Sequence, residues 1–115
     1  MQVNVESPQA GVTVLRLTGD LDMNEVAMFR PTLEKAVRNA QHGVILLLSE
    51  LTFMDSSGVA VLIEGLKWSQ RRSLPYVLVD LTSGVQMVIE LARLENFFTI
   101  AGNLEEAMAL IAGAS

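Results

Sequence analysis

The sequence predicts an α/β fold: one domain with a mixed, mainly parallel β-sheet of four or five strands, flanked by about four α-helices. Short apolar runs alternate along the chain with longer stretches of helical periodicity, which is the pattern of strands joined by helices. Residues 44–48 form a continuous apolar run, as buried parallel strands do. The 115 residues, of which 50% are hydrophobic, suit a single compact domain spanning residues 1–115.

Two strands are predicted at the start of the chain. Residues 2–5 alternate only weakly between apolar and polar side chains. Residues 12–17 are richer in valine and leucine and form the better strand candidate, which ends at the pair Thr18-Gly19.

A helix is predicted next, from a capping box of Asp22 and Glu25 to about Ala40. Pro31 lies inside this stretch, and proline lacks the backbone N–H that an interior helical position requires. We therefore expect the helix either to kink at Pro31 or to become regular only near Arg30.

The rest of the chain continues the alternation of strands and helices. A turn at residues 41–43 leads into a strand at residues 43–49 and a helix at residues 57–70. Two more strands are expected at residues 75–81 and 97–100, each followed by a helix. These helices begin with capping boxes and run over residues 83–93 (Ser83 with Gln86) and 103–112 (Asn103 with Glu106).

Composition excludes several functional classes. The chain has no cysteine and one histidine, and it lacks a dense carboxylate cluster, so we expect no metal and no cofactor. With a net charge of −5 and no basic stripe, it does not fit a nucleic-acid-binding protein. The start lacks a signal-peptide pattern, and no apolar run approaches the ~20 residues of a membrane span. We therefore expect a cytoplasmic protein without direct membrane insertion.

The sequence Asp55-Ser56-Ser57-Gly58 stands between two apolar segments, where the central strand ends and a helix begins. Functional groups gather at the carboxyl ends of strands in parallel sheets. Backbone N–H groups at a helix start lack partners, so either Asp55 or Ser56 is expected to cap them. Ser57 would then be an ordinary residue of the first turn, although capping does not rule out a second role for these side chains.

Periodicity also assigns faces to the helix at residues 57–70. One face is expected to pack on the core through Val59, Leu62, Ile63 and Leu66. The opposite face is expected to carry Ser57, Val61, Glu64 and Trp68. Two interpretations of Trp68 remain open: it packs against a neighbouring helix, or it belongs to an exposed stripe that binds a partner.

At this point the sequence resembles a known family, the anti-sigma factor antagonists with a bacterial STAS domain. Residues 51–58 are similar to the family's signature around the phosphorylated serine. The segment at residues 17–22 resembles the loop after its second strand, and residues 88–100 resemble its third helix and last strand. Residues 103–111 fit its closing helix, so the resemblance covers nearly the whole chain.

The resemblance implies a regulatory binding protein rather than an enzyme. Ser56 would be phosphorylated by an anti-sigma factor that is also a serine/threonine kinase, and a serine phosphatase would reset it. The unmodified form would bind the kinase and free the sigma factor. The environment of the phosphate would comprise Asp22, Asp55, Ser57 and Gly58. The partner-binding residues would be Asp20, Met54, Val61, Glu64 and Trp68.

A phosphate on Ser56 would meet two opposing effects. The helix N-terminus attracts it, whereas Asp22 and Asp55 repel it. We therefore expect the domain itself to change little on modification, and the switch to act at the partner interface.

Three alternatives remain. A serine enzyme is disfavoured because a serine nucleophile needs a nearby base, and His42 is predicted at the opposite end of the sheet. A STAS domain can also serve as a non-catalytic accessory subunit of a lipid-transport ABC ATPase or of a stress-signalling assembly. Weak self-association through Trp68 would be a third role.

Overall fold

The computed structural model describes residues 1–114 and has five strands and four helices in that range. In chain order the elements are β1 (Gln2–Gln9), β2 (Val12–Leu21), α1 (Val26–Asn39), β3 (Gly43–Met54), α2 (Ser56–Arg71), β4 (Tyr76–Val79), α3 (Ser83–Leu91), β5 (Thr99–Ala101) and α4 (Leu104–Gly113). This confirms the predicted α/β fold with its mainly parallel sheet.

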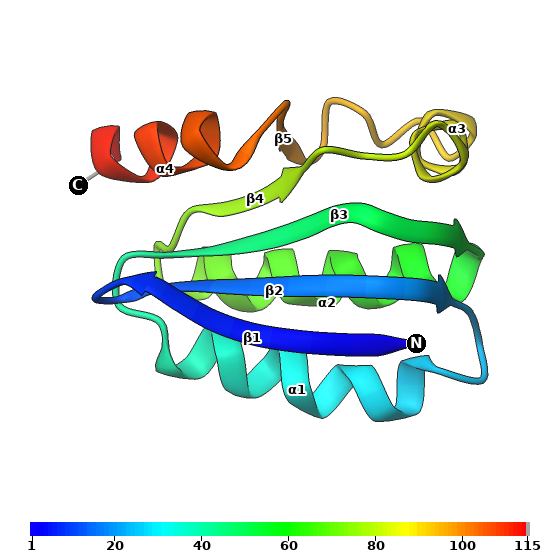
Figure 1. Cartoon of the computed structure of the whole chain (residues 1–115), viewed down its shortest axis with the longest axis horizontal. Coiled ribbons are helices and arrows are strands. Elements are labelled where there is room, and N and C mark those ends of the chain that lie inside the picture. Colours follow the sequence, from blue (N-terminus) through cyan, green and yellow to red (C-terminus); the bar gives the residue numbers. More distant parts are fainter. Residues whose placement is uncertain (115) are drawn as a thin grey trace.

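The sheet order follows the chain order, β1-β2-β3-β4-β5 (Figure 1). β1 pairs antiparallel with β2, and the other three pairings are parallel. All four parallel strands therefore end at the same side of the molecule. The loop that carries Ser56 follows the central strand β3 at that side.

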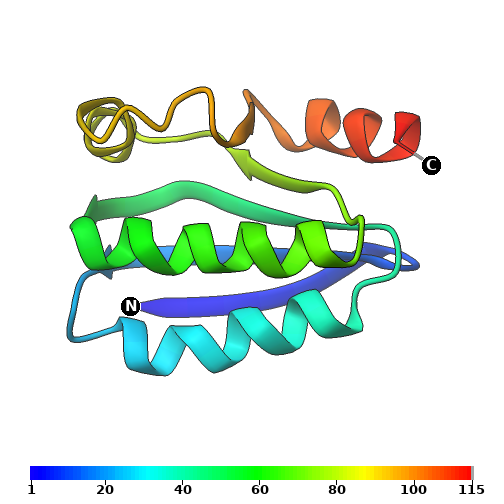
Figure 2. The same ribbon diagram turned by 180° about the vertical axis from the view of Figure 1, so that it is seen from behind.

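Helices cover both faces of the sheet, which explains the continuous apolar run in β3. On one face α1, α2 and α3 enclose a core with the alternate β3 residues Val44, Leu46 and Leu48. Figure 2, seen from behind, shows α1 and α2 side by side on this face, with their axes running along the strands. On the other face α4 packs over Ile45 and Leu47.

Strands β1 and β3 both extend further than predicted. β1 continues to Gln9. Its side chains are mostly exposed, so the weak alternation of polarity in the sequence predicted a strand that is too short. β3 continues through Met54, beyond the predicted end at residue 49. Its polar residues Ser49 and Glu50 lie where the outer face of the sheet is open to solvent, so they do not end the strand.

Two predicted helix caps are wrong. Asp22 does not cap α1: its carboxylate accepts a hydrogen bond from the N–H of Asn24 at 2.9 Å, and α1 begins at Val26 without a side-chain cap. α1 also starts well before Pro31, which lies inside it. The cap of α3 is Thr82, one residue earlier than predicted. In α4 the predicted cap, Asn103, is confirmed by its bond to the N–H of Glu106 at 2.8 Å.

Candidate functional site: the turn between β3 and α2

Ser56 is the first residue of α2 and lies at the carboxyl end of the central strand (Figure 1). Its side chain is exposed. Within residues 1–114 the Ser56 hydroxyl has no hydrogen-bond partner, so it is free to react or to contact another protein.

The preceding residue, Asp55, forms hydrogen bonds both to the first turn of α2 and to the loop after β2. Its Oδ1 atom accepts hydrogen bonds from the N–H groups of Ser57 and Gly58, at 3.0 and 3.2 Å. Its Oδ2 atom accepts one from the N–H of Met23, in the loop after β2, at 3.2 Å. The N–H of Asp55 donates to the carbonyl of Leu21 at 3.3 Å. Asp55 is therefore the cap of α2 and also its link to the β2–α1 loop; we call this set of contacts the Asp55 clasp.

The clasp favours the ionised carboxylate. The pKa of Asp55 is lowered from its ordinary value of 3.8, chiefly because the Ser57 hydroxyl donates a hydrogen bond to it. Removal from water acts in the opposite direction, and the backbone N–H groups of Gly58, Met23 and Ser57 lower the pKa further. Hydrogen bonds to a charged acceptor stabilise the charged form, which gives the sign of the shift.

The two neighbouring serines differ in what their hydroxyls do. The Ser57 hydroxyl donates to Asp55 Oδ1 at an O···O distance of 2.5 Å, and the residue is partly buried. Its hydroxyl is thus occupied inside the clasp. The sequence left open whether Asp55 or Ser56 caps the helix; the structure assigns the cap to Asp55, which leaves Ser56 outward.

Gly58 is required by close packing rather than by an unusual backbone angle. A Cβ atom at this position would lie 2.5 Å from the Cγ of Met54 and 2.7 Å from the carbonyl oxygen of Leu21. The first turn of α2 therefore rests directly on the ends of β2 and β3. This close approach brings the Asp55 carboxylate within reach of the Met23 N–H group.

The two aspartates before α1 have separate local roles. Asp22 closes its own turn, as described above, and sits next to Met23, which binds the clasp. Asp20 is exposed, and its Oδ1 accepts a hydrogen bond from the Thr52 hydroxyl at 2.8 Å. Asp20 thus lies at the end of β2 and Asp22 directly after it, and their roles toward a phosphate or a partner stay predictions.

Met54 and Val61 are misassigned as partner-binding residues. Their exposed fractions are 1% and 0%, so neither can contact a partner on the folded surface. Met54 points inward beneath Gly58. For Val61 the helical projection assumed a single buried face, but α2 is enclosed by the sheet and also packs against α1 and α3. A flank that looked exposed on the projection is therefore covered.

Glu64 and Trp68 occupy intermediate positions on α2. Glu64 accepts three hydrogen bonds from Arg30 of α1 at 3.0–3.3 Å, an ion pair that joins the two helices. Trp68 is partly buried against the main core, which favours the packing interpretation over an exposed stripe. Any partner contact by these two side chains stays a prediction.

Apolar side chains near the site were missed by the sequence reasoning. Met23 is 67% exposed beside the clasp, and Phe53 is 50% exposed at the end of β3. Met23 directly follows Asp22 in the chain, and Phe53 stands opposite Asp20 in the pairing of β2 with β3. For Met23 the available signal was an apolar side chain between the polar residues Asp22 and Asn24.

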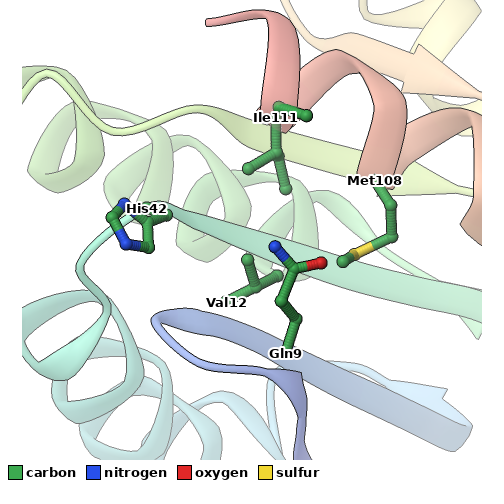
Figure 3. A pocket seen from close by; sticks show the side chains of 6 residues that line it. Gln9, Val12, His42, Met108 and Ile111 are labelled. Atoms are coloured by element: carbon green, nitrogen blue, oxygen red, sulfur yellow. The ribbon is translucent and has the colours of Figure 1, made fainter. Parts of the chain in front are cut away.

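The opposite end of the sheet carries the single histidine. His42 precedes β3, whereas Ser56 follows it, so the strand separates the two side chains. Figure 3 shows His42 beside a pocket of about 240 Å³ that is also lined by Gln9, Val12, Met108 and Ile111. His42 therefore cannot serve as a base for Ser56, and Ser56 does not line this pocket.

Neither a metal site nor a membrane-spanning helix is found within residues 1–114. Histidine and carboxylate side chains form no group of three that could hold a metal ion in that range. Among the helices described there, none is both long and apolar enough to span a bilayer.

Known proteins of similar length share this fold. The STAS domain model matches residues 4–107. An anti-sigma F factor antagonist from Paenibacillus polymyxa is 28% identical over 109 residues, which cover 94% of this chain and 92% of that protein. The solved structure of an anti-sigma factor antagonist from Mycobacterium paratuberculosis has a TM-score of 0.86 at 20% identity and covers 96% of this chain and 93% of its own.

SpoIIAA, also described as an anti-sigma factor antagonist, has been solved in two forms. The unphosphorylated form is 26% identical, with a TM-score of 0.82 and 97% of each chain covered. The phosphorylated form, from Bacillus, is 24% identical, with a TM-score of 0.73, covering 96% of this chain and 99% of that one. Since the family model spans most of the chain and these solved structures have the same fold, this chain belongs to the STAS domain family.

Proposed function

We propose that this chain is an anti-sigma factor antagonist that acts by binding, not by catalysis, in the cytoplasm. In its unphosphorylated form it binds an anti-sigma factor with serine kinase activity and so releases a sigma factor. Phosphorylation of Ser56 ends that binding, and a serine phosphatase restores it. The observation that carries the proposal is the free, exposed hydroxyl of Ser56 beside the Asp55 clasp.

The assignment to Ser56 rather than Ser57 rests on accessibility. A kinase must reach the hydroxyl oxygen, and the Ser57 hydroxyl is already bound to Asp55 in a partly buried position. Ser56 has neither restraint. The relatives named above, one of them solved in a phosphorylated form, support phosphorylation of a protein with this fold.

The clasp also determines how a phosphate would act. A phosphoserine carries about −1.5 to −2 charges at pH 7. The N–H groups of Ser57 and Gly58 already bind Asp55, so the helix N-terminus offers a phosphate on Ser56 less than a free terminus would. The new charge would face solvent and repel Asp55. Covering it with a partner that lacks a matching cation would cost several kcal/mol, and about 1.4 kcal/mol already lowers affinity tenfold.

Binding measurements with an anti-sigma factor kinase test the proposal. We expect wild type and Ser56→Ala to bind with equal affinity, and Ser56→Asp to bind at least about tenfold more weakly. After incubation with the kinase and ATP, mass spectrometry should find phosphate on the peptide that contains Ser56.

Ser83 supplies a matched control. It is exposed, it is the first residue of α3, and it directly follows the cap Thr82, as Ser56 follows Asp55. Ser83→Asp adds the same charge at an equivalent helix position and should leave kinase binding unchanged. Equal binding by Ser56→Ala and Ser56→Asp would remove Ser56 from the mechanism.

A further inference from the structure

A groove runs between β1 and α1, which lie side by side at one edge of the molecule (Figures 1 and 2). Val3 and Val5 of β1 stand opposite Leu17 and Leu15 of β2, so they point to the face that α1 covers. Val5 is nevertheless 55% exposed. The helix therefore leaves an open space beside the strand.

The wider part of this groove measures about 340 Å³, a volume in the range of small-molecule pockets. Among the residues that line it, Val5 and Ala36 are apolar, and the others carry hydrogen-bond donors: Thr13, Thr32, Lys35 and Asn39. Within residues 1–114 none of these four polar side chains has a hydrogen-bond or ion-pair partner. No carboxylate is among the lining residues, so Lys35 gives this part of the groove a positive charge.

A narrower part of about 200 Å³ adjoins the wider one at Thr32, which lines both. Its walls include the apolar side chains of Val3, Met28 and Phe29, and Met28 is 73% exposed. The one charged side chain in its lining, Glu25, pairs with the N-terminal ammonium group at 3.2 Å. This part of the groove therefore offers apolar surface and no unpaired cation.

We propose that the groove binds the free anion of a medium-chain fatty acid. The carboxylate would lie at Lys35, where the unpartnered donors can bind its oxygen atoms. The apolar chain would pass Val5 and end beside Met28. Lys35 and Met28 stand about two helical turns apart on α1, a separation of roughly 10 Å that a decanoate chain can span.

Charge fixes the direction of the ligand. A carboxylate is attracted by Lys35 at one end of the groove and repelled by Glu25 at the other. The apolar side chains Val3 and Met28 lie at the Glu25 end, so the end that repels the head is the end that fits the tail.

The end of α1 presents few free acceptors to such an anion. Unpartnered carbonyl groups at a helix C-terminus carry partial negative charge and would oppose it. The Ala36 carbonyl accepts a hydrogen bond from the N–H of Ala40 at 3.0 Å, and the Val37 carbonyl accepts one from the Arg72 guanidinium. Both acceptors are thus occupied, and Arg72 adds positive charge near this end of the helix.

An NMR titration of the full chain with decanoate, below its micellar concentration, tests the site. We expect amide shifts confined to the residues that line the two parts of the groove. Acetate has the same head without the chain and should bind at least about tenfold more weakly, because buried methylene groups add affinity. The inference does not rest on the proposed function, since none of these residues belongs to the Asp55 clasp and the titration needs no kinase.

Decylammonium separates this site from detergent-like adsorption. The chain has a net charge of −5, so non-specific attraction would favour the cationic amphiphile over decanoate. Binding in the groove reverses that order, because Lys35 repels an ammonium head. We expect decanoate to bind at least about tenfold more tightly than decylammonium.

Two charge reversals complete the test. Lys35→Glu should weaken decanoate binding at least about tenfold, with unchanged circular dichroism because the position is exposed. Lys67→Glu is the matched control: this exposed lysine of α2 lines neither part of the groove, so decanoate affinity should stay at the wild-type value. Absence of decanoate shifts, tighter binding of decylammonium, acetate binding as tightly as decanoate, or equal losses in the two lysine variants would overturn the proposal.

Discussion

The Asp55 carboxylate and the Ser57 hydroxyl are hydrogen-bonded to each other across the first turn of α2. Because that bond and the backbone bonds to Ser57 and Gly58 converge on one carboxylate oxygen, the intervening Ser56 is left without a partner and faces solvent. The arrangement separates the two adjacent serines into a structural one and an accessible one.

Replacing the clasp carboxylate should change how stability responds to acid. The pKa of Asp55 is lowered in the folded state, so its contribution is present above the ordinary value of 3.8 and is lost as pH falls through the folded value. We expect Asp55→Asn to be less stable than wild type in urea at pH 7. The gap should narrow at pH 3, whereas a gap that is constant with pH would contradict this role.

A methyl group at Gly58 should destabilise the fold strongly. The added Cβ would overlap the Leu21 carbonyl, which is backbone and cannot move aside easily, so we expect Gly58→Ala to lose about 2–3 kcal/mol in denaturant unfolding. Gly84, also in the first turn of a helix, is the matched control. Its nearest contact would be the Thr52 carbonyl at 3.6 Å, so Gly84→Ala should be neutral or gain up to about 1 kcal/mol.

Added charge should be tolerated at Ser56 and not at Ser57. Ser56→Asp places its carboxylate in solvent, and we expect its melting temperature and its NMR amide pattern in α2 to stay close to wild type. Ser57→Asp removes a hydroxyl donor and directs a second carboxylate at Asp55, so its melting temperature should fall by several degrees. Loss of helical signals in α2 for Ser56→Asp or for the phosphorylated protein would show that modification refolds the domain.

The single tyrosine should report on alkaline unfolding. Tyr76 is buried and donates a hydrogen bond from its hydroxyl to the Leu62 carbonyl at 2.9 Å. Burial raises the pKa of this phenol well above its ordinary value of 10.0. Its contribution to stability is therefore full below about pH 10 and decreases as pH rises further, because the unfolded chain then releases the proton.

An ultraviolet titration checks this directly. Phenolate absorbance should appear together with the loss of circular dichroism, rather than before it. A smooth titration of the folded protein near pH 10 would mean that solvent reaches the phenol.

Much of the fold could be predicted because the spacing of apolar residues in a segment depends on which of its faces are covered by neighbouring elements. The apolar run at residues 44–48 identified a strand covered on both faces, and that is how β3 lies. The strand predicted for β1 was too short for the converse reason. β1 is an edge strand with exposed side chains, so its backbone pairing produces little pattern in the hydropathy of the sequence.

The site was predicted in part, and the errors have a common origin. Segment spacing placed Ser56 where β3 ends and α2 begins, as the structure has it. Val61 and Met54 were misplaced because their burial is set by tertiary contacts, with neighbouring helices and with Gly58 respectively. The bond from Met23 to Asp55 joins residues 32 positions apart, a relationship that no local pattern contains.

Because the strands lie side by side in the order in which they occur in the sequence, no strand has to insert between two that are already joined. A nascent chain leaving the ribosome could add each strand to a finished neighbour. The contacts that position Ser56 come from β2, its following loop, and the start of α2, so this turn could form while the last third of the polypeptide is still being translated.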